Sequence, residues 1–401
     1  MDAELGEKVN ALASQVTDWE DFFTTAAENY SIPYSHKCLR MYAASTVPQK
    51  ELDRMSKVAK TSHMATLRVA AAQASFHKTC IAPLQPKYAY LKGIALTSQF
   101  GQNISDRYCR DVDIVVHKSD FTNVIHKAVQ VGYRVMLQDN PLIFASTQKD
   151  IDFVIKHTDV VTLVGSDRIP IEVHRRIGTL SLSFDLEHAF ETTETIDLFG
   201  TQVRTLSKAF HFVYACYHHS RHFWSRLHWV SDLTMMADWA RQNIEQVRTI
   251  ANSIGIMPTI QACLDFQALA AAPDEWTKPN SPTDGGALFL KACLLNLRSD
   301  LEFEKALRRQ RELGEFMWSW QVSPEQIPRL RKALGKRRYR PSVARHLKRQ
   351  YPSFLHWIYR LEAVFGAVKT NKSVDQISNA SNRENSLINA SHSGTKRTGM
   401  N

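Results

Sequence analysis

Two aspartates separated by one residue open the run Asp111-Val-Asp-Ile-Val-Val116. The apolar end of this run is typical of a buried strand. Side chains at positions i and i+2 of a strand point to the same face, so Asp111 and Asp113 should project together. Paired carboxylates are costly unless a cation lies between them, and Mg²⁺ bridging to phosphate oxygens fits such a pair. The pattern therefore predicts metal-dependent chemistry on phosphates.

A lysine and a glycine precede this pair in the chain. Lys92 and Gly93 end a short apolar segment at 88–91, expected as a strand, and open a helix-like segment at 94–100. Glycine lets the backbone approach a ligand closely, and a helix N-terminus offers free N–H groups to phosphate. Neither motif is specific alone, but their order and spacing indicate a phosphate site beside a metal site.

A later segment adds a third carboxylate. Glu172 and His174 alternate with two apolar residues in the expected strand 169–174. The polar pair should share one face, while the apolar pair packs inward. Taken alone, Glu172 is also explained as an exposed strand residue. For His174 we expect a hydrogen bond to a carboxylate rather than direct metal ligation.

The order of these motifs resembles the nucleotidyltransferase superfamily, and specifically its bacterial branch of uncharacterised nucleotidyltransferases. The resemblance covers about residues 85 to 240 and departs from the family at Arg110, where a small residue is usual. The matching motifs are Leu91-Lys-Gly-Ile-Ala-Leu96, Arg107 ahead of Asp111 and Asp113, Gly132-Tyr133 and Ile171-Glu-Val-His174.

The resemblance implies an α+β fold, a mixed nucleotidyltransferase-type sheet flanked by helices. It also implies that Asp111, Asp113 and Glu172 hold two Mg²⁺ ions, about 3.5–4 Å apart in such sites. Glu172 would complete one coordination sphere or act as base towards an acceptor hydroxyl. The triphosphate of an NTP, ATP included, would lie on the Gly93 turn, with Lys92 or Arg107 offsetting its charge. Attack at the α-phosphate would release pyrophosphate and leave a nucleoside monophosphate on the acceptor.

A histidine-rich segment at 206–224 is expected to form one long helix capped by Ser207. His211, His218 and His222 recur at helical spacing and should share one face. The family shows a similar helix followed by an aspartate like Asp232. We expect this helix to close over the nucleotide, with His218, His222 and Asp232 lining the nucleotide site. A zinc site at His218 and His222, or histidines that simply flank the core, are the alternatives.

The domain organisation follows from these segments. The expected regions are a helical cap at 1–85, a catalytic core at 86–180, a helical region closing the site at 181–270, a basic helical region at 285–369 and a disordered tail at 370–401. A second Asp-x-Asp, Asp150 and Asp152, is expected at a solvent-facing edge of a strand at 150–155. That strand should form a hairpin with 169–174 through a turn near 165–168, and Asp152 could reach the site from it.

The net charge and the cysteine pattern limit the possible partners and the cellular compartment. A net charge of +10 suits anionic partners, or simply solubility. The basic run from Arg329 to Arg349 could grip RNA, with Tyr339 for stacking, or form a solvated helix face. Six scattered cysteines without a Cys-x-x-Cys pair are typical of reduced thiols. With no secretory signal and no apolar run of about 20 residues, we expect a cytoplasmic protein without a membrane partner.

The main rival to an enzyme is a catalytically inactive nucleotide- or RNA-binding module on the same fold. Arg110 favours this rival, because a guanidinium beside the aspartates could replace a metal ion electrostatically. Kinase-like phosphoryl transfer is disfavoured because the sequence lacks a Gly-rich loop and a catalytic-loop motif.

Overall fold

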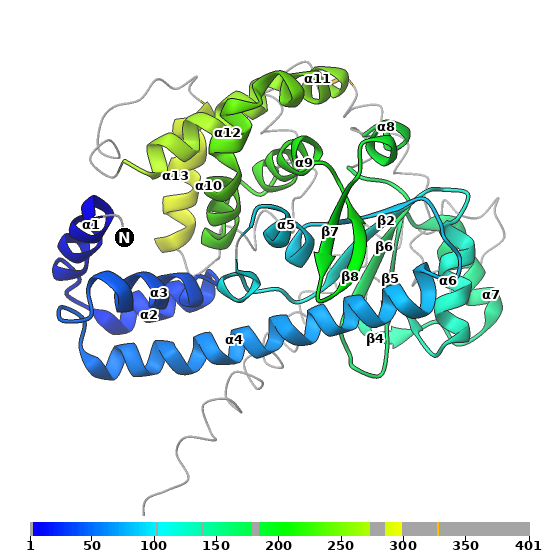
Figure 1. Cartoon of the computed structure of the whole chain (residues 1–401), viewed down its shortest axis with the longest axis horizontal. Helices are drawn as coiled ribbons and strands as arrows, with labels where there is room; N and C mark the ends of the chain where they lie inside the picture. Colours follow the sequence, from blue (N-terminus) through cyan, green and yellow to red (C-terminus); the bar gives the residue numbers. More distant parts are fainter. Residues whose placement is uncertain are drawn as a thin grey trace, which may run out of the picture. The chain divides into compact units, whose positions relative to one another are not determined.

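A computed structural model describes residues 3–101, 103–137, 140–178, 184–272, 285–298 and 327–328. The chain divides into two units, Met1–Arg337 and Arg338–Asn401, and all described residues belong to the first. An eight-stranded mixed sheet is flanked by helices (Figure 1), so the expected α+β fold is confirmed.

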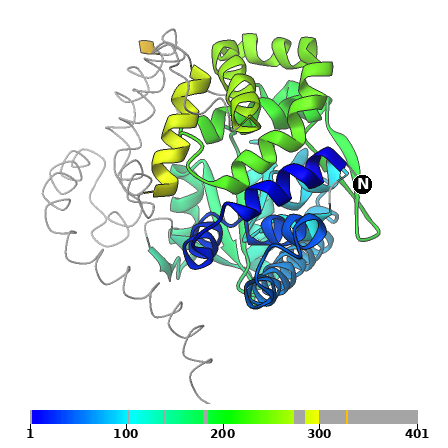
Figure 2. The same cartoon turned by 90° about the vertical axis from the view of Figure 1, so that its left-hand side faces the viewer.

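Four helices precede the sheet: α1 (Ala3–Ser14), α2 (Trp19–Glu28), α3 (Ile32–Tyr42) and α4 (Gln49–Phe76). Asp18 caps α2 by accepting hydrogen bonds from the backbone N–H groups of Glu20 at 2.9 Å and Asp21 at 3.0 Å. Helix α1 packs against α3, and Figure 2 shows α1 in dark blue beside these helices. They share a small apolar core that includes Ala13, Ile32, Leu39 and Met55.

The long helix α4 connects this small core to the sheet. Figure 1 shows it running from α2 and α3 past the strands. It passes into a π-helical turn (His77–Ile81) that leads to β1 (Tyr88–Leu91). The apolar segment at 88–91 is thus a strand, as expected. All four of its residues are buried, which explains why the segment has no polar alternation.

The remaining elements follow in chain order. They are α5 (Gly93–Gln99), a 3₁₀ turn (Ile104–Asp106), β2 (Val112–Val116), α6 (Phe121–Gln130), β3 (Arg134–Leu137), β4 (Asn140–Phe144), α7 (Gln148–His157), β5 (Val160–Val164), β6 (Pro170–His174), α8 (Leu186–Glu191), β7 (Glu194–Leu198), β8 (Thr201–Thr205), α9 (Lys208–Ser220), α10 (Leu227–Gln242), α11 (Ile244–Ile254), α12 (Met257–Ala270) and α13 (Gly285–Arg298).

The strand order is β4-β3-β5-β6-β2-β1-β8-β7. Strands β6 and β2 pair in parallel, as do β1 and β8, while the other neighbours are antiparallel. In this order β6 and β2 are the two middle strands of the sheet, and β1 lies next to β2. Every residue of β2 is buried, including Asp113.

The strand predicted at residues 150–155 is wrong. Residues 150–155 lie in helix α7, and the strand that forms the hairpin with β6 is β5. Thr147 and Asp150 form a capping box that starts α7, and Ile151, Val154 and Ile155 are buried along one helix face. Asp152 bonds to His126 at 3.0 Å. The capping box and the i, i+3, i+4 apolar spacing explain the helix.

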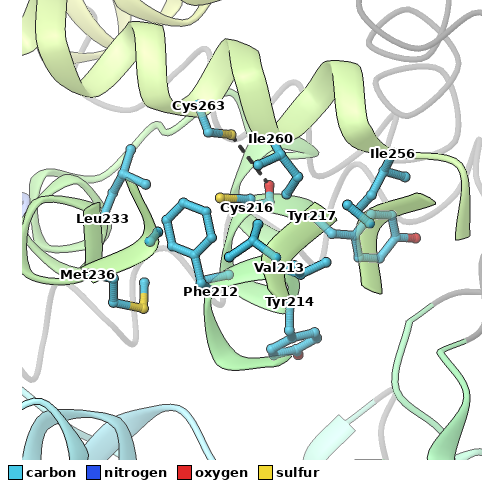
Figure 3. Packing of buried hydrophobic residues seen from close by; sticks show 14 of the residues in the cluster. Phe212, Val213, Tyr214, Cys216, Tyr217, Leu233, Met236, Ile256, Ile260 and Cys263 are labelled. Carbon is cyan, nitrogen blue, oxygen red and sulfur yellow. Dashed lines mark hydrogen bonds between the residues drawn. The ribbon is translucent and has the colours of Figure 1, made fainter. Parts of the chain in front are cut away.

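Helix α9 lies at the centre of a second, larger apolar core. Its residues Phe212, Val213, Cys216 and Tyr217 are almost completely buried, and Figure 3 shows them packed among side chains of α10 and α12. The Cys263 thiol donates a weak hydrogen bond to the Cys216 carbonyl oxygen at 3.9 Å. This core fixes α9 tightly against its neighbours.

The six cysteines are all free thiols. In the described ranges no helix combines the length and apolarity needed to cross a bilayer. Of the predicted basic helical region at 285–369, only residues 285–298 and 327–328 are described; the basic run at 329–349 and the predicted disordered tail at 370–401 lie outside the described residues. The division into a core and a closing region remains a prediction.

Candidate active site

The candidate site is formed by three adjacent central strands. In the register, Leu91 of β1 lies opposite Asp113 of β2, and Asp113 lies beside Glu172 of β6. Lys92 directly follows Leu91. Asp113 and Glu172, 59 positions apart in the chain, are therefore neighbours across the sheet. Pairing of β2 with β6 is what brings the third carboxylate to the first two.

Asp113 is the most highly connected residue of this group. Its Oδ1 atom lies 3.2 Å from Lys92 Nζ and 3.0 Å from His174 Nε2. His174 Nε2 also lies 3.5 Å from Glu172 Oε2. The donor atoms of Asp113, Glu172 and His174 all lie within 4.8 Å of one another. Two carboxylates and an imidazole at this separation fit a divalent cation.

The charges of this group are strongly coupled. Burial alone would raise the pKa of Asp113, but Lys92 and His174 outweigh it and lower the pKa to about 2. Burial likewise opposes protonation of His174, yet hydrogen bonds to Asp113 and Glu172 raise its pKa. The Lys92 pKa is also raised despite burial, first by Asp113. The site thus holds an ionised Asp113 carboxylate between Lys92 and His174, whose own pKa values this carboxylate raises.

Asp111 lies at the entrance to β2 and is not part of the three-residue group. Burial, together with repulsion from Asp113, raises its pKa to about 6. Glu172 adds to this repulsion, whereas Lys92 and Arg110 oppose it. A carboxyl that is hard to ionise beside a second carboxylate indicates a local excess of negative charge, which a further cation would relieve.

The Lys92–Gly93 turn is packed against the segment that carries the aspartates. Lys92 and Gly93 have φ angles of 56° and 44°, both in the left-handed region. A Cβ atom on Gly93 would lie 2.9 Å from Cys109 Sγ. The Cys109 thiol in turn donates to the Asp111 carbonyl oxygen at 3.3 Å. Glycine is therefore required both by conformation and by the close approach of the 109–111 segment.

Helix α9 covers Lys92. Lys92 Nζ lies 5.5 Å from the centroid of the Tyr214 ring, and the His218 ring lies 5.6 Å from that ring. Burial, then the positive charge of Lys92, lowers the pKa of His218 well below its ordinary value. His218 thus lies beside the Tyr214 ring that covers Lys92, and its expected role in lining the nucleotide site remains a prediction.

The prediction of one helix through Trp224, with His222 on its face, is wrong. Helix α9 ends at Ser220, because Phe223 and Trp224 adopt positive φ angles, so His222 lies in the turn that follows. His222 remains near His218, with ring centroids 5.5 Å apart. His211 is bound elsewhere, with Nδ1 2.5 Å from Gln99 Oε1. Within the described ranges, His218 and His222 belong to no group of three potential metal ligands.

His219, next to His218 on α9, is a further histidine near the candidate site, and the sequence patterns did not point to it. It is buried and stacks on Trp229, with ring centroids 4.7 Å apart. Its Nδ1 atom makes no hydrogen bond within the described structure. The adjacent pair His218-His219 could have drawn attention to His219, but the helical spacing of the other histidines favoured His218 and His222 instead.

Arg107 and Asp232 are each other's partners. Arg107 Nε and NH2 donate to the two carboxylate oxygens of Asp232 at 2.7 and 2.9 Å. Their side chains are 14% and 3% exposed. This bidentate pair joins the segment before β2 to helix α10. The sequence predicts that Arg107 offsets the charge of the triphosphate and that Asp232 lines the same nucleotide site. In the structure the two side chains bind each other instead.

Arg110 is exposed and turns towards the N-terminal helices. Its NH1 atom donates to the Tyr30 hydroxyl at 3.3 Å, and its guanidinium carbon lies 5.1 Å from the centroid of the Tyr30 ring. The residue that departs from the family pattern is therefore directed at Tyr30, although its charge still lowers the pKa of Asp111.

Comparison with known proteins agrees with the resemblance and extends it. The family model described as "Uncharacterised nucleotidyltransferase" matches residues 15–269, which includes helices α2 to α4 as well as the sheet and α9 to α11. No curated protein and no solved structure matches the chain. The family match covers well over half of the sequence and includes every residue of the candidate site. The chain therefore belongs to the family of uncharacterised nucleotidyltransferases.

Proposed function

We propose that this protein is a Mg²⁺-dependent enzyme that transfers a nucleoside monophosphate from an NTP to an acceptor hydroxyl and releases pyrophosphate. The observation that carries the proposal is the convergence of Asp113, Glu172 and His174 donor atoms within 4.8 Å, directly beside Lys92. Carboxylates and a lysine at one place suit a ligand that combines phosphates with divalent cations.

The residues divide into three roles in this proposal. Asp113 and Glu172, with Asp111 at the edge of the group, would hold the metal. His174 orients the Asp113 carboxylate through its 3.0 Å hydrogen bond. Bound Mg²⁺ would supply charge stabilisation for the transferred phosphoryl group. Glu172, which is half-buried whereas Asp113 and His174 are buried, is the residue best placed to accept a proton from an acceptor hydroxyl.

The donor nucleotide is expected on the Lys92 side. Lys92 and the Gly93 backbone N–H would contact the triphosphate, while His218 and His222 contribute hydrogen-bond donors from α9 and the turn after it. Arg107 and Asp232 then serve as a clamp that holds the aspartate-bearing segment, since each already satisfies the other. This assignment replaces direct phosphate contact by Arg107.

The test is incubation of the purified protein with each α-³²P-labelled NTP in Mg²⁺, with cell extract as the source of acceptor. Label should appear on an acceptor, and Asp113→Asn should abolish it. Asp152→Asn, on the exposed face of α7, is the matched control and should retain labelling. Transfer that survives Asp113→Asn would refute the assignment of the site.

The second candidate is a nucleotide-binding module without turnover. It is favoured by Lys92, whose Nζ at 3.2 Å from Asp113 Oδ1 already supplies a cation to the carboxylates. Titration of nucleotide binding against Mg²⁺ separates the two candidates. An enzyme should bind the nucleotide more tightly with Mg²⁺, whereas a module neutralised by Lys92 should bind equally well in EDTA and label no acceptor.

A further inference from the structure

An aromatic and cationic cluster lies next to the candidate site, and no role is assigned to it above. The Tyr30 and Tyr108 rings are stacked with centroids 5.2 Å apart and an interplanar angle of 12°. The guanidinium groups of Arg110 and Arg226 lie 5.1 and 5.3 Å from the Tyr30 ring centroid. His228 meets the same ring edge-on at 5.4 Å. We call these five residues the Tyr30 cluster.

Three distant segments build the Tyr30 cluster. Tyr30 follows α2 with a φ angle of 55°, Tyr108 and Arg110 belong to the aspartate-bearing segment, and Arg226 and His228 lie at the start of α10. Arg226 donates to the Glu28 carbonyl oxygen, which ties α10 to the end of α2. The rings are consequently held in place by backbone contacts from elements that are themselves packed.

The cluster retains groups that a ligand can contact. Arg110 is exposed, and Tyr30 and Tyr108 are partly exposed. Within the described ranges Arg110 forms no ion pair with a carboxylate, and its guanidinium donates to the Tyr30 hydroxyl at 3.3 Å. Tyr108 has one face on Tyr30 and no second aromatic ring among the described residues. A planar group can stack on such a tyrosine while the guanidinium binds a phosphate.

The cluster lies on the Asp111 side of the site. Arg110 directly precedes Asp111 in the chain. Lys92, in contrast, contacts Asp113 at 3.2 Å and is covered by Tyr214 of α9. With the donor triphosphate expected at Lys92, the Tyr30 cluster is the neighbouring surface that is left for the acceptor.

We propose that the Tyr30 cluster is the acceptor subsite and that it binds the terminal nucleotide of a single-stranded nucleic acid. This inference rests on the proposed function, because only a transferase has an acceptor. Tyr108 would stack on the terminal base, Arg110 would contact a backbone phosphate, and the terminal hydroxyl would then face Asp111. The exposed guanidinium of Arg110 supplies positive charge for such a polyanion at the cluster.

The experiment measures fluorescence anisotropy of a labelled single-stranded RNA of about twelve nucleotides with the full-length protein in EDTA, so that no transfer occurs. Tyr108→Ala should weaken RNA binding about tenfold, while Tyr108→Phe, which keeps the ring, should bind like the wild type. Arg110→Gln should reduce the slope of log affinity against log salt by about 0.7. Arg248→Gln, which removes a surface arginine from α11, is the charge-matched control and should leave the slope unchanged.

Several results would overturn the inference. Absence of RNA binding by the wild type would do so, as would equal affinity of Tyr108→Ala and Tyr108→Phe. If Tyr108→Ala weakened binding of free NTP but not of RNA, the cluster would belong to the donor base. Thermal unfolding of each variant excludes a fold defect as the cause. Since binding is measured without turnover, its failure is distinguishable from a failure of labelling in the Asp113→Asn experiment.

Discussion

Removing Asp232 should destabilise the protein far more than removing another aspartate from the same helix. Asp232→Ala leaves the Arg107 guanidinium, 14% exposed, without the two carboxylate oxygens at 2.7 and 2.9 Å that it now contacts. Loss of one partner of a buried ion pair costs about 3–5 kcal/mol, because the remaining charge stays desolvated. At about 2 °C per kcal/mol for a large domain, the melting temperature should fall by roughly 6–10 °C.

The matched control is Asp238→Ala, also on α10. Asp238 is 88% exposed and lies 3.3 Å from Arg241, so its loss should cost at most about 1 kcal/mol. Differential scanning calorimetry and urea unfolding of both variants measure the difference. The double variant Arg107→Met/Asp232→Leu should recover most of the lost stability, because apolar residues of similar volume can replace a buried pair. If Asp232→Ala lowered the melting temperature no more than Asp238→Ala, the interpretation of Arg107 and Asp232 as a buried clamp would be wrong.

Two further predictions concern the aspartate-bearing segment. Gly93→Ala should lower the free energy of unfolding by about 1–3 kcal/mol, since its Cβ would lie 2.9 Å from Cys109 Sγ at a φ of 44°. Gly200→Ala is the control, because Gly200 has a φ of 82° but no atom near its Cβ position. Urea unfolding of Gly200→Ala therefore measures the cost of the backbone conformation alone. A smaller loss in Gly93→Ala than in Gly200→Ala would contradict the close packing. Folding raises the pKa of Asp111 from 3.8 to about 6, so the folded state binds the extra proton and stability falls as pH rises through that window. Relative to Asp111→Asn, the wild type in EDTA should therefore lose up to about 3 kcal/mol between pH 4 and 6 in urea unfolding; a constant difference across that range would exclude a raised pKa.

The sequence by itself was enough for the features that depend on neighbouring residues. The strands around Asp113 and Glu172 and the helix cap formed by Ser207 were all predicted and are present. Apolar alternation, breaker residues and capping side chains act within a few residues, so they can be read directly. The order of motifs around Lys92 likewise indicated the family. Their assignment as site residues remains a proposal.

The two wrong secondary-structure predictions have local causes. Residues 150–155 contain alternating apolar residues that suit a strand, but the capping box of Thr147 and Asp150 favours a helix. The predicted helix through Trp224 overshoots because Phe223 and Trp224 have left-handed backbone conformations that propensity does not reveal.

Contacts between distant residues were decided only by the tertiary structure. Arg107 meets Asp232 across 125 positions, and Tyr30 stacks on Tyr108 although each belongs to a different part of the chain. In sequence, each of these residues could equally face solvent, a ligand or the core. Packing of α10 and α2 against the aspartate-bearing segment selects one partner for each, because buried charges and hydrogen-bonding groups must be satisfied when water is excluded.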